Sequence, residues 1–396
     1  MADPDLWLRE AVKDDGTSYY EYVLLYVDDA LGISEHPKEQ LMEIDNYFSF
    51  KKDSLAEPKI YLGAKLSLET LPNGVSAWGI SSSKYVQESI SNLERKLSAK
   101  GMKLRNNTRA PITAGYRPEL DISKELTPND ASLYQSLIGS LRWIVEMGRI
   151  DIITEVSMMS SFVALPREGH LQQVLHIFAY LKAHHNARII MDPSYPDIAE
   201  DDFPRHDWST FYKDCKEIIP PNAPKPLGLE MVIRACVDAD HAGDKMSRRS
   251  RTGFIVWVNS APIYWFSKKQ QGVETSTFGS EFLAMKTCCE YLKGLRYKLR
   301  MMGIPIEHCC FVSGDNKSVL YNTTLPDSVL KKKAHSIAYH YVREGSARDE
   351  WRTNYIHSDE NPADICTKAL PSGIKRKEKV RMIMYDIYPL EDEKHE

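Results

Sequence analysis

The sequence lacks the features that would place the protein in a membrane or outside the cell. Its seven cysteines are an odd number, include two adjacent pairs and have no C-x-x-C spacing, which argues against a zinc ribbon and against a secreted disulfide scaffold. The longest apolar run near the start, Tyr22 to Val27, is far shorter than the ~20 residues that span a bilayer. The first residues show no basic segment followed by an apolar one, so we expect no signal peptide. An intracellular protein without membrane contact is expected.

An excess of positive charge is also missing. The chain has 51 Lys and Arg against 55 Asp and Glu, a formal net charge of −4. This excludes a polycation that holds nucleic acid by bulk charge, so any such binding must come from local patches. With 42% hydrophobic and 27% charged residues, the composition is that of an ordinary globular protein, which excludes disorder of the whole chain. The length of 396 residues suggests two or three domains.

The first half of the chain reads as a strand-rich part followed by a helical part. Two short apolar runs flank the polar pair Asp28-Asp29, which is a hairpin signal. A second strand pair contains Tyr61-Leu62-Gly63, and from Ser82 onward apolar residues recur at helical spacing. We predict a strand-rich domain over 1–80 and a helical region over 81–191.

A proline-rich, acidic segment separates these parts from a second module. Seven prolines fall within 192–227, so we predict a linker there. The apolar patterns of 228–372 predict the order β-β-β-α-β-α-β-α, and 373–396 reads as a charged tail. The fold class is therefore α/β within this module and α+β for the whole chain.

Four carboxylates stand at special points of the second module. Asp238 ends its first strand, Glu281 lies on its first helix, Asp315 ends its fourth strand, and Asp364 starts its last helix. In this order the first and fourth strands would lie side by side and parallel, which would bring the four residues together. Grouped carboxylates raise each other's pKa unless cations lie among them, and such a group suits two Mg²⁺ ions. The alternative is that these residues are surface acids and helix caps.

The pair Asp28-Asp29 at the hairpin tip has two interpretations. Turn aspartates commonly only form the turn. As part of a polymerase metal site, the pair would need a further carboxylate on a neighbouring strand.

A series of motifs, in order along the chain, resembles the Pol polyproteins of Copia-type LTR retrotransposons. The N-terminal half contributes Tyr26-Val27-Asp28-Asp29, Tyr61-Leu62-Gly63 and the block from Tyr134 to Ile152, similar to a reverse transcriptase palm and thumb. The second module resembles the family's RNase H. The segments that carry this second likeness are Asp238-Ala239-Asp240, Arg248-Arg249-Ser250, Trp265 to Gln270, Ser280-Glu281-Phe282, Asp315-Asn316, Tyr339 to Glu344 and Asn361 to Lys368.

The resemblance implies roles for individual residues. Asp238, Glu281, Asp315 and Asp364 would be the RNase H metal ligands for Mg²⁺, with Mn²⁺ as a substitute. His357 would assist proton transfer. Asp28 and Asp29 would be two of three polymerase aspartates, and the primer grip would consist of Tyr61, Leu62 and Gly63. The residues that would contact a nucleic-acid backbone are basic: Arg248, Arg249, Arg251, Lys268 and Lys269. For these basic residues, a solvated basic turn is the alternative.

The resemblance also implies a partner and a limit. The partner would be an RNA–DNA hybrid, with other Pol or Gag components as further partners, in the cytoplasm, a virus-like particle or the nucleus. Nothing before Tyr22 resembles the palm strand that carries the third polymerase aspartate, so we expect a truncated palm without polymerase activity. Two functions stay open at this point: hydrolysis of the RNA strand of the hybrid, or a non-catalytic remnant that at most binds nucleic acid.

Overall fold

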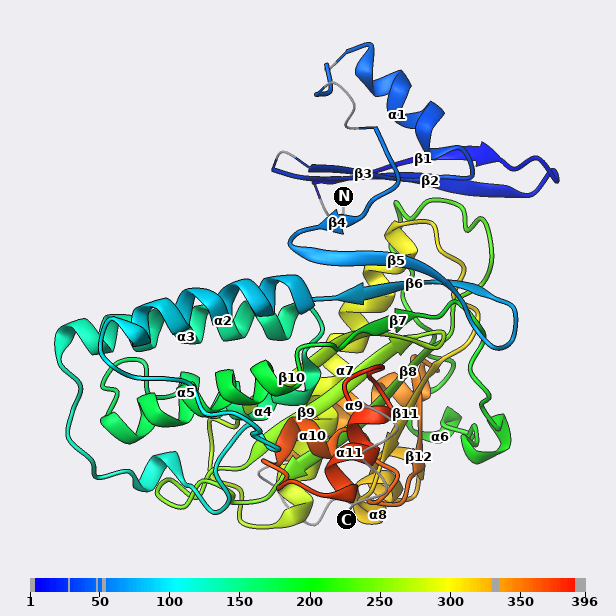
Figure 1. The fold of residues 1–396 in the computed structure, drawn as a ribbon. Coiled ribbons are helices and arrows are strands. Elements are labelled where there is room, and N and C mark those ends of the chain that lie inside the picture. The colour runs from blue at the N-terminus through cyan, green and yellow to red at the C-terminus, as the bar shows by residue number, and fades with distance from the viewer. Residues whose placement is uncertain (1–3, 28, 48, 52–54, 330–334, 389–396) are drawn as a thin grey trace.

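The computed structural model describes residues 4–27, 29–47, 49–51, 55–329 and 335–388, which form three sheets and a set of helices (Figure 1). The first sheet is the antiparallel hairpin pair β1 (Leu6–Val12), β2 (Ser18–Tyr26) and β3 (Asp29–Ile33). The expected hairpin around Asp28-Asp29 is therefore present. Helix α1 (Pro37–Asp45) follows, and the sequence reading, which saw only strands and turns in this part, was wrong there.

The second sheet joins the strand-rich part to the helical part. Its order is β4 (Ile60–Tyr61), β5 (Ala64–Thr70), β6 (Ser76–Ser81) and β7 (Ile189–Met191). Since β7 comes after the last helix of the helical region and pairs with β6, the two parts are tied by backbone hydrogen bonds. The predicted boundary between the two parts, at residue 80, therefore lies in β6, within this continuous four-stranded sheet.

The helical region begins with α2 (Ser83–Ser98) and continues through α3 (Pro128–Glu146), the 3₁₀ turn η2 (Ile150–Ile152), α4 (Ile153–Ser160) and α5 (Glu168–Ala183). The residues before and in the first turn of α3 explain why this helix begins there. The Thr127 hydroxyl accepts a hydrogen bond from the backbone N–H of Asp130, and Pro128 occupies the first turn. Within the part of the chain that the structure describes, no helix is long and apolar enough to cross a membrane.

The second module is a five-stranded mixed sheet in the order β10-β9-β8-β11-β12. Its strands are β8 (Ile233–Asp240), β9 (Arg251–Val258), β10 (Ala261–Lys269), β11 (Cys310–Gly314) and β12 (Trp351–Tyr355). As expected, β8 and β11 lie side by side and parallel, with Val237 opposite Gly314. The long helix α7 (Thr277–Met301) connects β10 to β11. The α/β arrangement predicted for this module is confirmed.

Two helices lie between β11 and β12 where one was expected. Helix α8 (Lys317–Thr324) begins at Asn316, whose side chain accepts from the Val319 N–H, and α9 (Ser336–Ala347) follows. The order predicted from the sequence has a single helix at this point, and residues 330–334, between α8 and α9, lie outside the described residues. The cap at Asn316 is the feature that starts the unexpected helix.

Both faces of the five-stranded sheet are buried, by different parts of the chain. On one face Ala235, Val237 and Phe254 pack with α7 in one hydrophobic core. On the other face Cys236, Ile255 and Trp257 belong to the core that also contains α2, α3 and α5 of the helical region. The alternation of side chains along β8 and β9 therefore joins the helical region and the second module into one packed body (Figure 1).

The segment 192–227 lies packed along the second module. Phe203 is buried against Phe311 of β11, with ring centroids 4.9 Å apart. Glu217 accepts hydrogen bonds from Arg296 and Arg300 of α7 at 2.6 Å. Two short helical turns, η3 (Glu200–Asp202) and α6 (Ser209–Tyr212), are its regular elements.

The C-terminal segment after 372 also enters a core. Helix α10 (Asp364–Thr367) is followed by α11 (Ile374–Arg381). Val380 and Ile383 pack in the helical region's core, and the buried Arg376 forms an ion pair with the buried Glu155 of α4 at 3.3 Å. Composition alone suggested a charged tail, because the cations that anchor this segment read as solvated residues.

We expect Glu217 to stabilise the fold in a pH-dependent way. Burial opposes ionisation, but hydrogen bonds from Arg296 and Arg300 outweigh it and lower the pKa of Glu217 to about 2 from 4.5. The stabilisation is thus complete above pH 4.5 and is lost as the pH falls toward 2. Glu217→Gln should lower the free energy of unfolding by about 2 kcal/mol at pH 7, and less at pH 3.

The measurement is urea unfolding of both proteins at pH 7 and pH 3. The control is Glu307→Gln, which removes an exposed carboxylate and should change stability by less than about 0.5 kcal/mol. Equal stability of Glu217→Gln and the unchanged protein at pH 7 would contradict this account.

Candidate active site

The site is organised around Asp238, near the end of the central strand β8. Its side chain is 1% exposed. The Thr367 hydroxyl donates a hydrogen bond to its Oδ2, whereas Oδ1 is buried and has no hydrogen-bond partner among the described residues. Such a buried oxygen without a partner costs free energy unless a donor or a cation reaches it.

Three of the four predicted carboxylates lie together. Side-chain oxygens of Asp238, Glu281 and Asp315 are all within 4.8 Å of one another. The parallel pairing of β8 with β11 brings Asp238 and Asp315 to the same edge, and the first turns of α7 place Glu281 above it. Burial, with repulsion from the neighbouring carboxylates, raises the pKa of Asp238 to about 6 and that of Glu281 to about 9.

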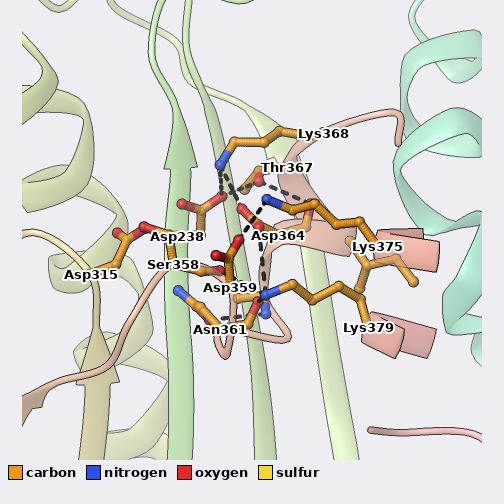
Figure 2. A network of polar contacts seen from close by, with 12 residues as sticks. Asp238, Asp315, Ser358, Asp359, Asn361, Asp364, Thr367, Lys368, Lys375 and Lys379 are labelled. Carbon is orange, nitrogen blue, oxygen red and sulfur yellow. Dashed lines mark hydrogen bonds and ion pairs between the residues drawn. The ribbon is translucent and has the colours of Figure 1, made fainter. Parts of the chain in front are cut away.

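The fourth carboxylate, Asp364, is near this group but paired elsewhere. It begins α10 and is 2% exposed. Its Oδ1 accepts from the Lys368 ammonium at 2.5 Å, and its Oδ2 lies 3.7 Å from the Lys379 ammonium. Lys368 also lies 3.3 Å from Asp238 Oδ2, so one ammonium group bridges the two aspartates (Figure 2). The group of clustered carboxylates therefore has three members rather than the expected four, and its role as a cation site stays a prediction.

The loop 357–361 lines the other side of the site (Figure 2). Ser358 donates to Asp315 Oδ2 at 2.7 Å, and the Asn361 amide donates to the Val237 carbonyl on β8 at 2.9 Å. Lys379 of α11 donates to the carbonyls of Ser358 and Asn361. His357 is exposed and lies 3.7 Å from the Asp359 carboxylate.

Sequence reasoning missed the residues that support the carboxylates. These are Ser358, Asn361, Thr367, Lys368 and Lys379. The signal for three of them was present, because the block from Asn361 to Lys368 was singled out and a role was given only to Asp364. For Lys379 no signal existed, since it lies in the segment that reads as a charged tail.

Those predicted polymerase residues that the structure describes belong to the N-terminal sheets or to the turn between β4 and β5. Asp28 lies outside the described residues, and Asp29 starts β3 with its side chain exposed. No group of three potential metal ligands among the described residues includes Asp29. Tyr61, Leu62 and Gly63 form the tight turn between β4 and β5, where Leu62 and Gly63 have φ of 51° and 86°. The primer-grip role and the loss of polymerase activity stay predictions.

The predicted basic contacts divide into exposed and buried residues. Arg248, Arg249 and Lys268 are exposed. Lys269 is paired with Asp244 at 2.8 Å, and Arg251 is buried. Arg248, Arg249 and Lys268 are thus the residues that can contact a ligand at the surface, and their exposure is equally that of a solvated basic turn.

The second module has the α/β class and the parallel β8–β11 pairing that the sequence predicts, with three of the four predicted carboxylates together. No family model matches the chain. It is 25% identical over 354 residues to the retrovirus-related Pol polyprotein from transposon RE1 of Arabidopsis thaliana, covering 88% of this chain and 20% of that protein. It is 26% identical over 381 residues to the Pol polyprotein from transposon TNT 1-94 of Nicotiana tabacum, covering 93% and 24%. The resemblance to Copia-type retrotransposon Pol polyproteins is confirmed, and this chain spans about a fifth to a quarter of their length.

Solved structures give a weaker likeness. LC11-RNase H1 in complex with an RNA/DNA hybrid is 14% identical, with a TM-score of 0.28, over 34% of this chain and 93% of that one.

Gly253 is expected to control how closely α10 approaches the sheet. It lies opposite Asp238 in the β8–β9 pairing. A Cβ there would lie 2.5 Å from a Thr367 methyl and 2.9 Å from the Cys366 carbonyl carbon, so α10 would have to move. Gly253→Ala should therefore lower the free energy of unfolding by about 1–3 kcal/mol, measured by urea unfolding.

The matched control is Gly294→Ala on the exposed side of α7. Nothing lies within 4 Å of its added Cβ, so this change should stabilise the protein by about 0.5–1 kcal/mol. If both alanine variants shift stability in the same direction, the close approach at Gly253 is not a constraint.

Proposed function

We propose that the second module hydrolyses the RNA strand of RNA–DNA hybrids with the help of divalent metal ions. The observation that carries this proposal is the convergence of Asp238, Glu281 and Asp315 within 4.8 Å. Together with the Pol resemblance, it favours a phosphodiester as the bond that is cut.

The residues present fit a hard divalent cation. Three carboxylates offer oxygen ligands, which Mg²⁺ and Mn²⁺ prefer. The unpartnered Oδ1 of Asp238 is a vacant ligand atom inside the group, and a cation there would reverse the raised pKa of Asp238 and Glu281. Asp238, Glu281 and Asp315 would hold the first ion. A second ion would need Asp364 to exchange Lys368 for metal.

A bound divalent ion would supply an activated water and offset the charge that develops on a phosphodiester under attack. The protein's own residues hold the carboxylates in position. Thr367 and Lys368 hold Asp238 Oδ2, which leaves Oδ1 directed to the ligand side. Ser358 holds Asp315 Oδ2 in the same way. His357, exposed one residue before Ser358, is our candidate for proton transfer to the leaving oxygen.

Hybrid recognition would rest on backbone and 2′-hydroxyl contacts, since proteins read A-like duplexes by shape. The exposed Arg248, Arg249 and Lys268 are candidates for the phosphate contacts. Their place on β10 and in the loop between β8 and β9 puts them on the module that carries the carboxylates.

One observation favours the alternative of a chain that binds nucleic acid without cutting it. Asp364 is held by two ammonium groups, from Lys368 and Lys379. If this pairing persists with substrate bound, the cation site would have three carboxylates and one ion.

Cleavage of a labelled RNA–DNA hybrid decides between these functions. We expect cutting of the RNA strand in Mg²⁺, none in EDTA, and a loss of at least about 100-fold in Asp315→Asn, because a metal ligand is removed. Asp201→Asn removes an exposed acid elsewhere and should cut normally. A folded, hybrid-binding protein that does not cut in Mg²⁺ or Mn²⁺ would overturn the nuclease proposal.

Metal binding can be tested without activity. Because a ligand that binds only the folded state stabilises it, 10 mM Mg²⁺ should raise the unfolding temperature by about 1–3 °C. The rise should be absent in Glu281→Gln and unchanged in Asp201→Asn. An equal rise in all three proteins would show that the carboxylates hold no ion.

A further inference from the structure

A cavity of about 300 Å³ lies where the helical region meets the second module. Its walls come from the loop 112–119, from residues of 158–162 at the end of α4, from residues of 240–251 at the β8–β9 connection, from Lys269 of β10, and from residues of 367–371 at and after the end of α10. Lys368 lines it and also contacts Asp238 and Asp364. Lys368 thus connects the cavity to the carboxylate group. None of Asp238, Glu281 and Asp315 lines the cavity.

The cavity is also lined by Arg251, a buried cation that forms no ion pair with a described residue. Arg251 is 9% exposed. Its guanidinium donates to the hydroxyls of Ser157 on α4 and Ser267 on β10, at 2.6 and 3.3 Å. Arg251 forms no ion pair with a described residue, and Asp240, which lies opposite it in the β8–β9 pairing, compensates its charge only in part. Burial lowers the pKa of Arg251 to about 10, as expected where a buried cation lacks full compensation.

Two further arginines, from different parts of the chain, line the same cavity. Arg117 comes from the loop of the helical region, and Arg249 comes from the second module. Both are exposed, and neither forms an ion pair with any residue that the structure describes. The other two cations in the wall are already paired, Lys269 with Asp244 and Lys368 with Asp238 and Asp364.

The acids in the cavity wall do not cancel these arginines. Asp244 is neutralised by Lys269, which leaves Asp240 and Glu119. Glu119 is engaged by the backbone N–H of Lys245 at 2.9 Å. Even if both acids are counted as fully charged, the three unpaired guanidinium groups leave an excess of one positive charge.

We propose that this cavity is a phosphate-binding site that Arg117, Arg249 and Arg251 share across the junction of the two parts. Guanidinium groups bind phosphate through paired N–H donors, and the volume holds a phosphate group with room for its substituents. The phosphate is either one of a nucleic-acid backbone or a free anion. The inference rests on the proposed function only for the choice of an RNA–DNA hybrid as the polymer.

A purely structural role for Arg251 explains less. Its two serine contacts account for one nitrogen of the guanidinium, Nη1, which makes both hydrogen bonds. That role gives no reason for Arg117 and Arg249 to line the same space, and neither of them supports the fold through an ion pair within the described ranges. A phosphate site accounts for all three.

The test is equilibrium binding of a labelled RNA–DNA hybrid in EDTA, where no turnover occurs, to the full chain and to Arg117→Gln and Arg249→Gln. Each variant should raise Kd about fivefold to tenfold and reduce the slope of log Kd against log salt by about 1. Arg142→Gln removes an exposed arginine of α3 outside the cavity and should change Kd less than twofold. Both tested arginines are exposed, so folding should be kept.

A second arm uses inorganic phosphate, followed by calorimetry on the same proteins. Weaker hybrid binding in the two variants, with no phosphate binding, identifies a backbone phosphate. Unchanged hybrid binding with phosphate affinity that the variants lose identifies a free anion. If the two variants match Arg142→Gln in both arms, the phosphate site is overturned. The binding assay contains no Mg²⁺ and requires no cleavage. It therefore tests the phosphate site even if the protein proves not to cut the hybrid.

Discussion

Burial of the five-stranded sheet on both faces is the constraint on which the rest of the structure depends. A sheet whose strands β8 and β9 carry apolar side chains in both directions cannot stand with one face in water. Helix α7 covers one face, and the helical region, far away in sequence, covers the other. The C-terminal segment with α11 then closes the second core, where Arg376 meets Glu155 in a fully buried ion pair. Removing one partner of such a pair leaves an uncompensated buried charge. The ion pair therefore holds α11 against the helical region.

The candidate site lies at the edge between these two cores, which explains its electrostatics. Asp238 is on the side of β8 that faces α10, beside Cys236 and opposite Gly253, whereas Glu281 comes from the helix on the other face. The carboxylates are therefore buried by two independent layers. Desolvation is the largest cause of the raised pKa of both Asp238 and Glu281. Lys368 offsets part of this cost at both residues, and the cation of the proposed function would offset more of it.

How much of this was predictable follows from the range of the interactions. The strand pattern of β8 to β11 and the parallel pairing of β8 with β11 follow from local alternation and known topology, and these were enough to bring Asp238, Glu281 and Asp315 together. The pairing of Asp364 with Lys368 and Lys379 could not be foreseen, because Lys379 lies on a helix whose charged residues hide its buried face. The same holds for Arg251, which reads as part of a basic turn and is buried only because α4 packs over β10.

Lys368 connects the two sites in a way that limits how they can work. Its ammonium group can compensate Asp238 and Asp364, or it can turn toward an anion in the neighbouring cavity, but it cannot do both fully with one charge. A phosphate held by Arg117, Arg249 and Arg251 would draw Lys368 toward the cavity that it already lines. That movement would leave Asp364 paired with Lys379 alone, so one ammonium group fewer would compete with a cation for this carboxylate. Substrate contact at the junction of the two parts and completion of the cation site would then be coupled through a single side chain, which is a physical reason for the helical region and the second module to share one core.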